Sequence, residues 1–133
     1  MDRITKKLFT QAKRVRQNAF APISHYKVGA AALTKGGRIF SACNVESATV
    51  TLTTHAEAAA IDQAVAAGER TIVKIIVVVA EKAPVFPCGL CRQKIAEFSG
   101  NAEVIAVTMR GATRRAFIKD LYPEPFVMKN LEK

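Results

Sequence analysis

The sequence predicts an α/β protein, a three-layer α/β/α sandwich built on a mixed five-stranded sheet. Residues 72–80 are almost wholly apolar, with Ile and Val at both odd and even positions, so this strand is expected to be buried on both faces. Helices must then cover both sides of the sheet. Residues 103–109 form a second buried strand, and the helical segment 88–98 between them implies a parallel pair with a right-handed crossover.

The N-terminal part predicts an amphipathic helix followed by a β-hairpin. Apolar residues recur at helical intervals over residues 2–18, with charges on the other face. These apolar residues are Ile4, Leu8, Ala12, Val15 and Ala19. Pro22 ends the helix, and two runs of mainly small apolar residues follow at 26–33 and 38–43. The turn Lys35-Gly36-Gly37 between them predicts the hairpin.

The remaining segments complete the sandwich. Residues 55–67 predict a helix that Gly68 closes as a C-cap. A short strand or loop around residues 113–116 and a helical turn near residues 117–121 follow the last buried strand. A chain of 133 residues, half of them apolar, has room for one hydrophobic core, so we expect residues 1–133 to form a single domain.

The net charge of +9 allows a polyanionic partner, which raises DNA or RNA as a substrate. The distribution of charge favours a solvated basic surface instead, because no aromatic stacking pattern accompanies the cations. The cations gather in the first helix and near the end of the chain, at Lys6, Lys7, Lys13, Arg14, Arg16, Arg110, Arg114 and Arg115.

The start of the chain and its cysteines indicate the compartment. Met1 is followed by a charged amphipathic segment without the apolar core of a signal peptide, and no apolar run approaches a membrane span. Of the three cysteines, two stand in a Cys-x-x-Cys pair and only Cys43 is left, so no disulfide framework is possible. We therefore expect a soluble, cytoplasmic protein.

Two distant motifs predict a catalytic zinc site. Cys88 and Cys91 directly follow Pro87 at i and i+3, so at a helix start both sulfurs lie on one face. The N–H groups and the dipole of a helix start lower the pKa of a thiol. With His55 as the third ligand, two sulfurs and one nitrogen suit a tetrahedral zinc, one per chain, with a fourth position open.

Glu57 indicates chemistry rather than structure. A carboxylate two residues after the histidine ligand is placed to face a water in the open position. Zinc lowers the pKa of such a water towards about 7, and a nearby carboxylate can take its proton and pass it to the substrate. The order H-x-E, then P-C-x-x-C, is the known signature of zinc deaminases.

The alternative for these motifs is a structural zinc clip or a reducing Cys-x-x-Cys pair. A Cys-x-x-Cys pair alone would favour that alternative. The enzyme hypothesis is preferred because all five constrained positions occur in order. These positions are His55, Glu57, Pro87, Cys88 and Cys91.

Beyond these motifs, the chain resembles the cytidine deaminase family of small, homotetrameric zinc enzymes over nearly its full length. The segment Ser24-His25-Tyr26-Lys27-Val28-Gly29-Ala30-Ala31 is similar to the opening strand of that family, and Cys43-Asn44-Val45-Glu46 is similar to its nucleoside-binding turn. Arg92-Gln93 after Cys91 is typical of this family rather than of relatives that edit tRNA or DNA. Leu121-Tyr122-Pro123-Glu124-Pro125-Phe126 resembles its C-terminal segment.

The resemblance implies a role for each matching residue. Tyr26 would lie against the nucleoside, and Asn44 and Glu46 would bond the ribose hydroxyl. Phe126 would help close a site, near a subunit boundary of a homotetramer with shared active sites. The same resemblance implies His55, Cys88 and Cys91 as zinc ligands, Glu57 as proton shuttle, and a place in pyrimidine salvage.

The chain departs from the family at three places. His55 stands where small tetrameric members usually have Cys, and Ala58 where they have Arg. The two changes fit each other, because a neutral imidazole leaves less negative charge to balance than a third thiolate. Residues 47–50 read Ser-Ala-Thr-Val instead of the usual Asn-Ala-Ser-Tyr. A small side chain at Val50 could enlarge the pocket for a modified base or a compound such as blasticidin S.

Several of these residues also have simpler interpretations. Cys43 ends an apolar strand, where a free cysteine is usually a small buried hydrophobe. His25 is better explained as a surface loop residue. For Tyr26 and Phe126, ordinary core packing would be preferred without the resemblance.

The predicted reaction is hydrolytic deamination of free cytidine or 2′-deoxycytidine to uridine or 2′-deoxyuridine and ammonia. Glu57 would protonate N3 and later the leaving amine. Two alternatives stay open at this point. One is a deaminase of a bulkier cytosine nucleoside, and the other is a zinc protein that acts on nucleic acid through its basic surface.

Overall fold

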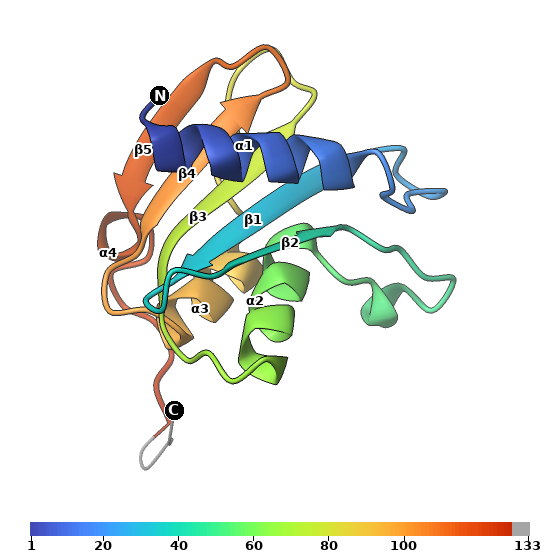
Figure 1. The fold of residues 1–133 in the computed structure, drawn as a ribbon. Coiled ribbons are helices and arrows are strands. Elements are labelled where there is room, and N and C mark those ends of the chain that lie inside the picture. Colours follow the sequence, from blue (N-terminus) through green and yellow to red (C-terminus); the bar gives the residue numbers. More distant parts are fainter. Residues whose placement is uncertain (129–133) are drawn as a thin grey trace.

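The centre of the structure is a single mixed sheet in the order β2-β1-β3-β4-β5 (Figure 1). The computed structural model describes residues 1–128 of the chain. The strands are β1 (Val28–Thr34), β2 (Ile39–Cys43), β3 (Ile72–Val79), β4 (Glu103–Thr108) and β5 (Thr113–Phe117). Among the named strands of residues 1–128, β3 and β4 pair in parallel, and the other neighbouring strands pair antiparallel. The predicted mixed five-stranded sheet, with its hairpin and its parallel pair, is confirmed.

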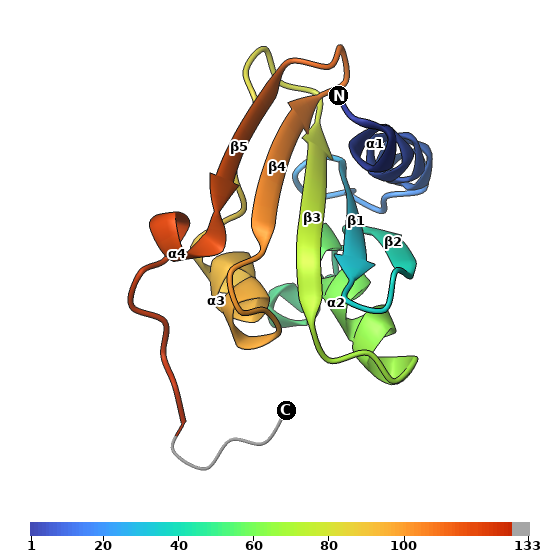
Figure 2. The ribbon, with the colours of Figure 1, turned by 60° about the vertical axis from the view of Figure 1, so that its left-hand side comes forward.

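Helices cover both faces of this sheet, as the sequence predicts. The helix α1 (Arg3–Arg16) lies across one face, whereas α2 (Ala56–Ala66) and α3 (Gly89–Glu97) lie on the other (Figures 1 and 2). The short α4 (Ile118–Leu121) and a 3-10 turn, η1 (Val50–Leu52), complete the elements. No helix within residues 1–128 has the length and apolar character needed to cross a membrane.

The alternation of side chains along β3 divides the core into two parts. Ile76 and Val78 pack with Leu8 on the α1 side, while Ile75 belongs to the cluster under α2 and α3. Each such residue, fully removed from water, stabilises the fold by about 1.5–3 kcal/mol. Three consecutive alanines of β1 are fully buried, which lets helices approach this strand from both sides. These are Ala30, Ala31 and Ala32.

The contact of α1 with the sheet differs in detail from the prediction. The buried residues of this helix are Thr5, Leu8 and Ala12, whereas Ile4 and Val15 are only half-buried. The difference arises because the backbone of α1 comes very close to β1. A Cβ atom added at Gly29 would lie 2.1 Å from the carbonyl oxygen of Ala12. Small side chains such as Ala12 therefore lie at the closest contact with β1, and Leu8 packs with Ile76 and Val78 of the neighbouring β3.

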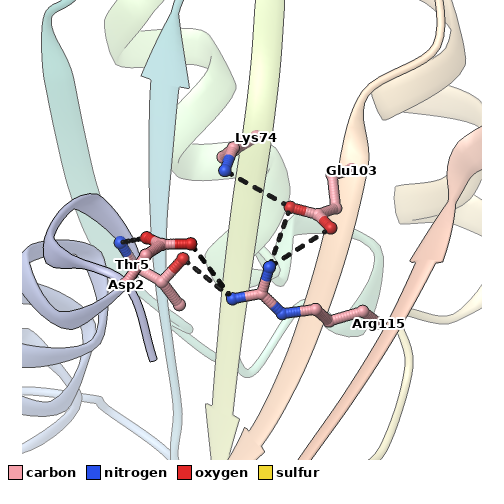
Figure 3. Close-up of polar contacts among 5 residues, drawn as sticks. All are labelled: Asp2, Thr5, Lys74, Glu103 and Arg115. Carbon is pink, nitrogen blue, oxygen red and sulfur yellow. Dashed lines mark hydrogen bonds and ion pairs between the residues drawn. The ribbon is translucent and has the colours of Figure 1, made fainter.

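A polar network fixes the start of α1 to the sheet (Figure 3). Arg115 of β5 donates to the Thr5 hydroxyl at 3.0 Å and lies 3.4 Å from the Glu103 carboxylate and 3.6 Å from that of Asp2. Lys74 of β3 pairs with Glu103 at 3.5 Å. Asp2 also caps α1, since its Oδ1 accepts from the Thr5 N–H at 2.8 Å. The network therefore joins α1, β3, β4 and β5.

Candidate metal centre and active site

The starts of α2 and α3 bring the three predicted metal ligands together. His55 is the N-cap residue of α2 and Cys88 that of α3, while Cys91 lies in the first turn of α3. The Nδ1 atom of His55 lies 3.3 Å from the Cys88 sulfur and 3.5 Å from the Cys91 sulfur. All three ligand atoms lie within 4.8 Å of one another. His55 thus forms one cluster with two cysteines that follow it by 33 and 36 positions in the chain.

The cluster fits zinc in donor type and in spacing. Zinc binds thiolate and imidazole at about 2.0–2.3 Å, so a tetrahedral site places its ligand atoms roughly 3.5 Å apart. Burial raises the pKa of the buried Cys91 thiol, and the nearby charges of Glu57 and Cys88 raise it further. Such a thiol becomes a thiolate only beside a strong positive charge, which a divalent metal supplies. With three protein ligands, a fourth position is left for a small molecule.

Glu57 is the buried acid of the site. It stands in the first turn of α2 and is only 6% exposed. Burial raises the pKa of the Glu57 carboxyl, an effect that its own backbone N–H and the charge of His55 partly offset. A carboxyl with a raised pKa exchanges a proton more readily near neutral pH, which suits general acid and base catalysis.

A cavity of about 620 Å³ lies against this cluster. Its volume is in the range of sites that hold small molecules, about 300–1,000 Å³. His55, Glu57 and Cys88 line the part that contains the cluster. The apolar part of the lining includes Val77, Val79, Val85 and Phe86, and the polar part includes Ser24, Tyr26, Asn44, Glu46 and Arg92.

Asn44 lines the cavity, and its amide bonds within the chain. Its Oδ1 accepts from the Val28 N–H at 2.9 Å, and its Nδ2 donates to the Tyr26 carbonyl at 2.7 Å. The side chain is 8% exposed. Asn44 therefore holds the backbone that leads into β1, so a ligand reaching its amide would share an atom that is already bonded.

Glu46 also lines the cavity and is bonded to the loop before β1. Its carboxylate accepts from the Ile23 N–H at 2.9 Å, from the Ser24 N–H at 3.1 Å and from the Ser24 hydroxyl. These hydrogen bonds, led by that of the Ser24 hydroxyl, lower the pKa of Glu46. A carboxylate has about four acceptor positions, so one is still free for a sugar hydroxyl.

The two predicted aromatic contacts differ in position. Tyr26 lines the cavity, and partial burial together with the nearby Glu81 raises the pKa of its phenol. Phe126 does not line it and is 69% exposed. The Gln93 side chain holds the Phe126 backbone, accepting from its N–H at 3.0 Å and donating to its carbonyl at 2.8 Å. Within one chain the structure does not bring Phe126 to the site.

Sequence reasoning did not identify the apolar wall of the cavity. Val77 and Val79 look like any buried strand residues, and Phe86 lies in a loop with no recognisable pattern. Arg92 was noted only as a family feature. It donates from Nε to the Pro87 carbonyl at 2.7 Å and from Nη1 to the Leu121 carbonyl at 3.0 Å, and so supports the turn that carries Cys88.

The fold and the site together define an α/β protein with a metal centre and a buried carboxyl beside it. The family model described as "Cytidine and deoxycytidylate deaminase zinc-binding region" matches residues 2–108, which include the whole cluster. The chain belongs to this cytidine and deoxycytidylate deaminase family, which is a family of zinc-binding proteins.

Relatives and solved structures agree with this assignment. The cytidine deaminase of Sporosarcina psychrophila is 36% identical over 127 residues, which cover 95% of this chain and 93% of the relative. A probable cytidine deaminase of Dictyostelium discoideum is 38% identical over 128 residues, covering 95% and 86%. The crystal structure of the Burkholderia pseudomallei cytidine deaminase is 40% identical, with a TM-score of 0.87, and covers 95% of this chain and 100% of that chain.

Proposed function

We propose that this protein deaminates free cytidine or 2′-deoxycytidine by hydrolysis, releasing ammonia and uridine or 2′-deoxyuridine. The observation that carries the proposal is the buried carboxyl of Glu57, which shares a cavity with the ligands His55 and Cys88. A purely structural zinc site has no use for a buried acid at this place. The relatives named cytidine deaminase support the same reaction.

In the proposed mechanism Glu57 moves two protons. His55, Cys88 and Cys91 would hold the zinc ion, which supplies a more acidic water for attack on ring carbon 4. Glu57 takes one proton from the attacking water and gives it to N3. It then takes the second proton and gives it to the exocyclic amine, so that the C–N bond breaks and ammonia leaves. The raised pKa of Glu57 suits both transfers.

Tyr26, Asn44 and Glu46 are the proposed contacts of the nucleoside within one chain. Tyr26 offers an aromatic ring to the nucleoside, and the free acceptor position of Glu46 fits a sugar hydroxyl. Asn44 donates one amide N–H to the Tyr26 carbonyl and has a second N–H for a sugar hydroxyl. The sequence predicts that Val50 enlarges the pocket through its small side chain, but Val50 does not line the cavity of the single chain. Similarity to the relatives named cytidine deaminase favours unmodified cytosine nucleosides over bulkier ones.

The proposed assembly is a homotetramer in which neighbouring chains complete each site, with Phe126 near a shared boundary. Support comes from exposed apolar side chains around the loops before β1 and after β2. These are Phe20, Ile23, Val45, Val50 and Leu52. A water-excluding wall from a neighbour would strengthen the electrostatics of the site. The proposal also includes a role in pyrimidine salvage in the cytoplasm.

Two measurements test these proposals. Ammonia release from a panel of cytosine nucleosides should be fastest with cytidine or 2′-deoxycytidine, and no release by zinc-loaded protein would contradict the proposed reaction. Light scattering should show a particle of four chains. A fully active monomer of 14.4 kDa would contradict shared sites and leave the zinc chemistry untouched.

A further inference from the structure

Phe86 lines the cavity and has no role in the proposed proton transfers. It directly precedes the buried Pro87 and lies two residues before the ligand Cys88. Its half-buried ring lines the cavity and packs against Val77 and Val79, which line it too. The ring is thus part of the apolar wall and is joined to a metal ligand by two peptide units.

Arg114 of β5 holds this ring. Its guanidinium carbon lies 4.7 Å from the centre of the Phe86 ring, which is a cation–π contact. The guanidinium has no hydrogen-bond or ion-pair partner among residues 1–128, in contrast to that of the neighbouring Arg115. Stacking on Phe86 is therefore the one interaction that the structure gives this charge within the described part of the chain.

The chemistry of cytosine indicates what this wall faces. A base with ring carbon 4 at the metal centre and N3 facing Glu57 has carbon 5 as the other neighbour of carbon 4. Carbon 5 and carbon 6 form the apolar edge of the ring, so an apolar wall close to a metal ligand suits that edge. Phe86 is the largest side chain in the apolar part of the lining.

We propose that Phe86 determines specificity by limiting the substituents that the site accepts at carbon 5 of the pyrimidine, and that Arg114 is the positioning residue for its ring. This inference rests on the proposed deamination of cytosine nucleosides. The wild-type protein disfavours 5-methylcytidine relative to cytidine, because a methyl group at carbon 5 meets the Phe86 ring.

The test compares kcat/KM for 5-methylcytidine with kcat/KM for cytidine in each variant. Phe86→Ala should raise this ratio about tenfold or more, the lower end of what one methyl-sized space is worth in a hydrophobic pocket. Phe86→Leu should raise it less. Arg114→Met should raise it about two- to fivefold, because the ring loses a contact of cation–π strength. Arg110→Met, an exposed cation in the preceding turn, is the matched control and should leave the ratio unchanged.

The possible results separate the inference from the proposed function. Equal losses of kcat/KM for both substrates in the Phe86 and Arg114 variants would mean a structural role only, and would overturn the inference while deamination stands. A wild-type protein that releases no ammonia from any cytosine nucleoside would overturn both. If Phe86→Ala fails to fold, Arg114→Met decides, since that side chain lies on the surface and outside the core clusters.

Discussion

The two faces of the sheet bury the same kinds of strand residues but differ in what their helices contribute. On one face α1 packs on β1 and β3 through Ala12 and Leu8, and a polar network holds its N-terminal end. On the other face the starts of α2 and α3 meet and bring two thiols and an imidazole together. The comparison teaches that both faces stabilise the fold through buried apolar clusters, while the second face also holds a buried acid and metal ligands at some cost in stability.

The largest effect is expected on the face with the site. Cys91→Ser should abolish zinc binding and activity, because a hydroxyl is a poor replacement for a thiolate ligand of zinc. Metal analysis of the purified variant measures this directly. Ser99→Ala, at the far end of α3, is the control and should keep one zinc per chain. Full zinc content in Cys91→Ser would mean that the ion is held elsewhere.

The next largest effect is a loss of stability at the contact between α1 and β1, and zinc binding should be unchanged. Gly29→Ala places a Cβ 2.1 Å from the backbone oxygen of Ala12, so the helix must move away from β1. We expect the free energy of unfolding to fall by about 2 kcal/mol, within the range for overpacked cores. Gly100→Ala, which adds its Cβ to open space, should change it little. Denaturant unfolding with parallel zinc analysis tests both, and loss of zinc in Gly29→Ala would show that the faces are coupled.

A smaller loss of stability is expected from the polar network. Arg115→Met removes the shared partner of Thr5, Glu103 and Asp2 while Lys74 stays paired with Glu103. Because the arginine is about one-third exposed, the expected loss is about 1 kcal/mol. Ammonia release per chain should be unchanged. A change in activity without a change in unfolding would contradict a purely stabilising role.

Features of the two faces that depend on residues close together in the sequence could be predicted, whereas features that depend on distant residues could not. The sequence of strand 72–79 is apolar at both odd and even positions, so its burial on both faces can be predicted locally. Each half of the metal site also lies within one helix start, where the spacing of residues fixes their geometry. These halves are His55 with Glu57, and Cys88 with Cys91. Which side of α1 touches β1 depends on the close approach at Gly29, which no local pattern of α1 records. The sequence therefore favoured Ile4 over Thr5.

The cavity walls were harder to predict than the metal ligands. Phe86 reaches the site because Arg114 and the strand β3 place its loop, and these contacts span many residues of the chain. The sequence predicts Asn44 as a sugar contact, and the bonds of its amide to the backbone of Tyr26 and Val28 are an additional role that the motif does not reveal. A sequence motif indicates which residue type a position requires. It does not reveal which groups that residue contacts in the folded chain.

The smallest effect is a pH dependence at the start of α1. The Thr5 backbone N–H, and next its hydroxyl, lower the pKa of Asp2 from 3.8 to about 2. A lowered pKa in the folded state means that the charge stabilises the fold above about pH 4, and that this contribution is lost as the pH falls towards 2. Asp2→Asn keeps the cap and removes the charge. The difference in unfolding midpoint between the two proteins should therefore be present at pH 6 and vanish near pH 2, whereas a constant difference would contradict this origin.

The central claim is that the second face of the sheet performs proton transfer through Glu57 beside a bound zinc. Glu57→Gln tests it most directly, because the amide keeps the shape of the side chain and cannot shuttle a proton. Zinc content and ammonia release from cytidine are measured on the same sample. We predict one zinc per chain and a rate lower by about 10²–10⁴-fold, the usual contribution of a general acid or base. A zinc-loaded variant that keeps more than about a tenth of the wild-type rate would contradict the claim.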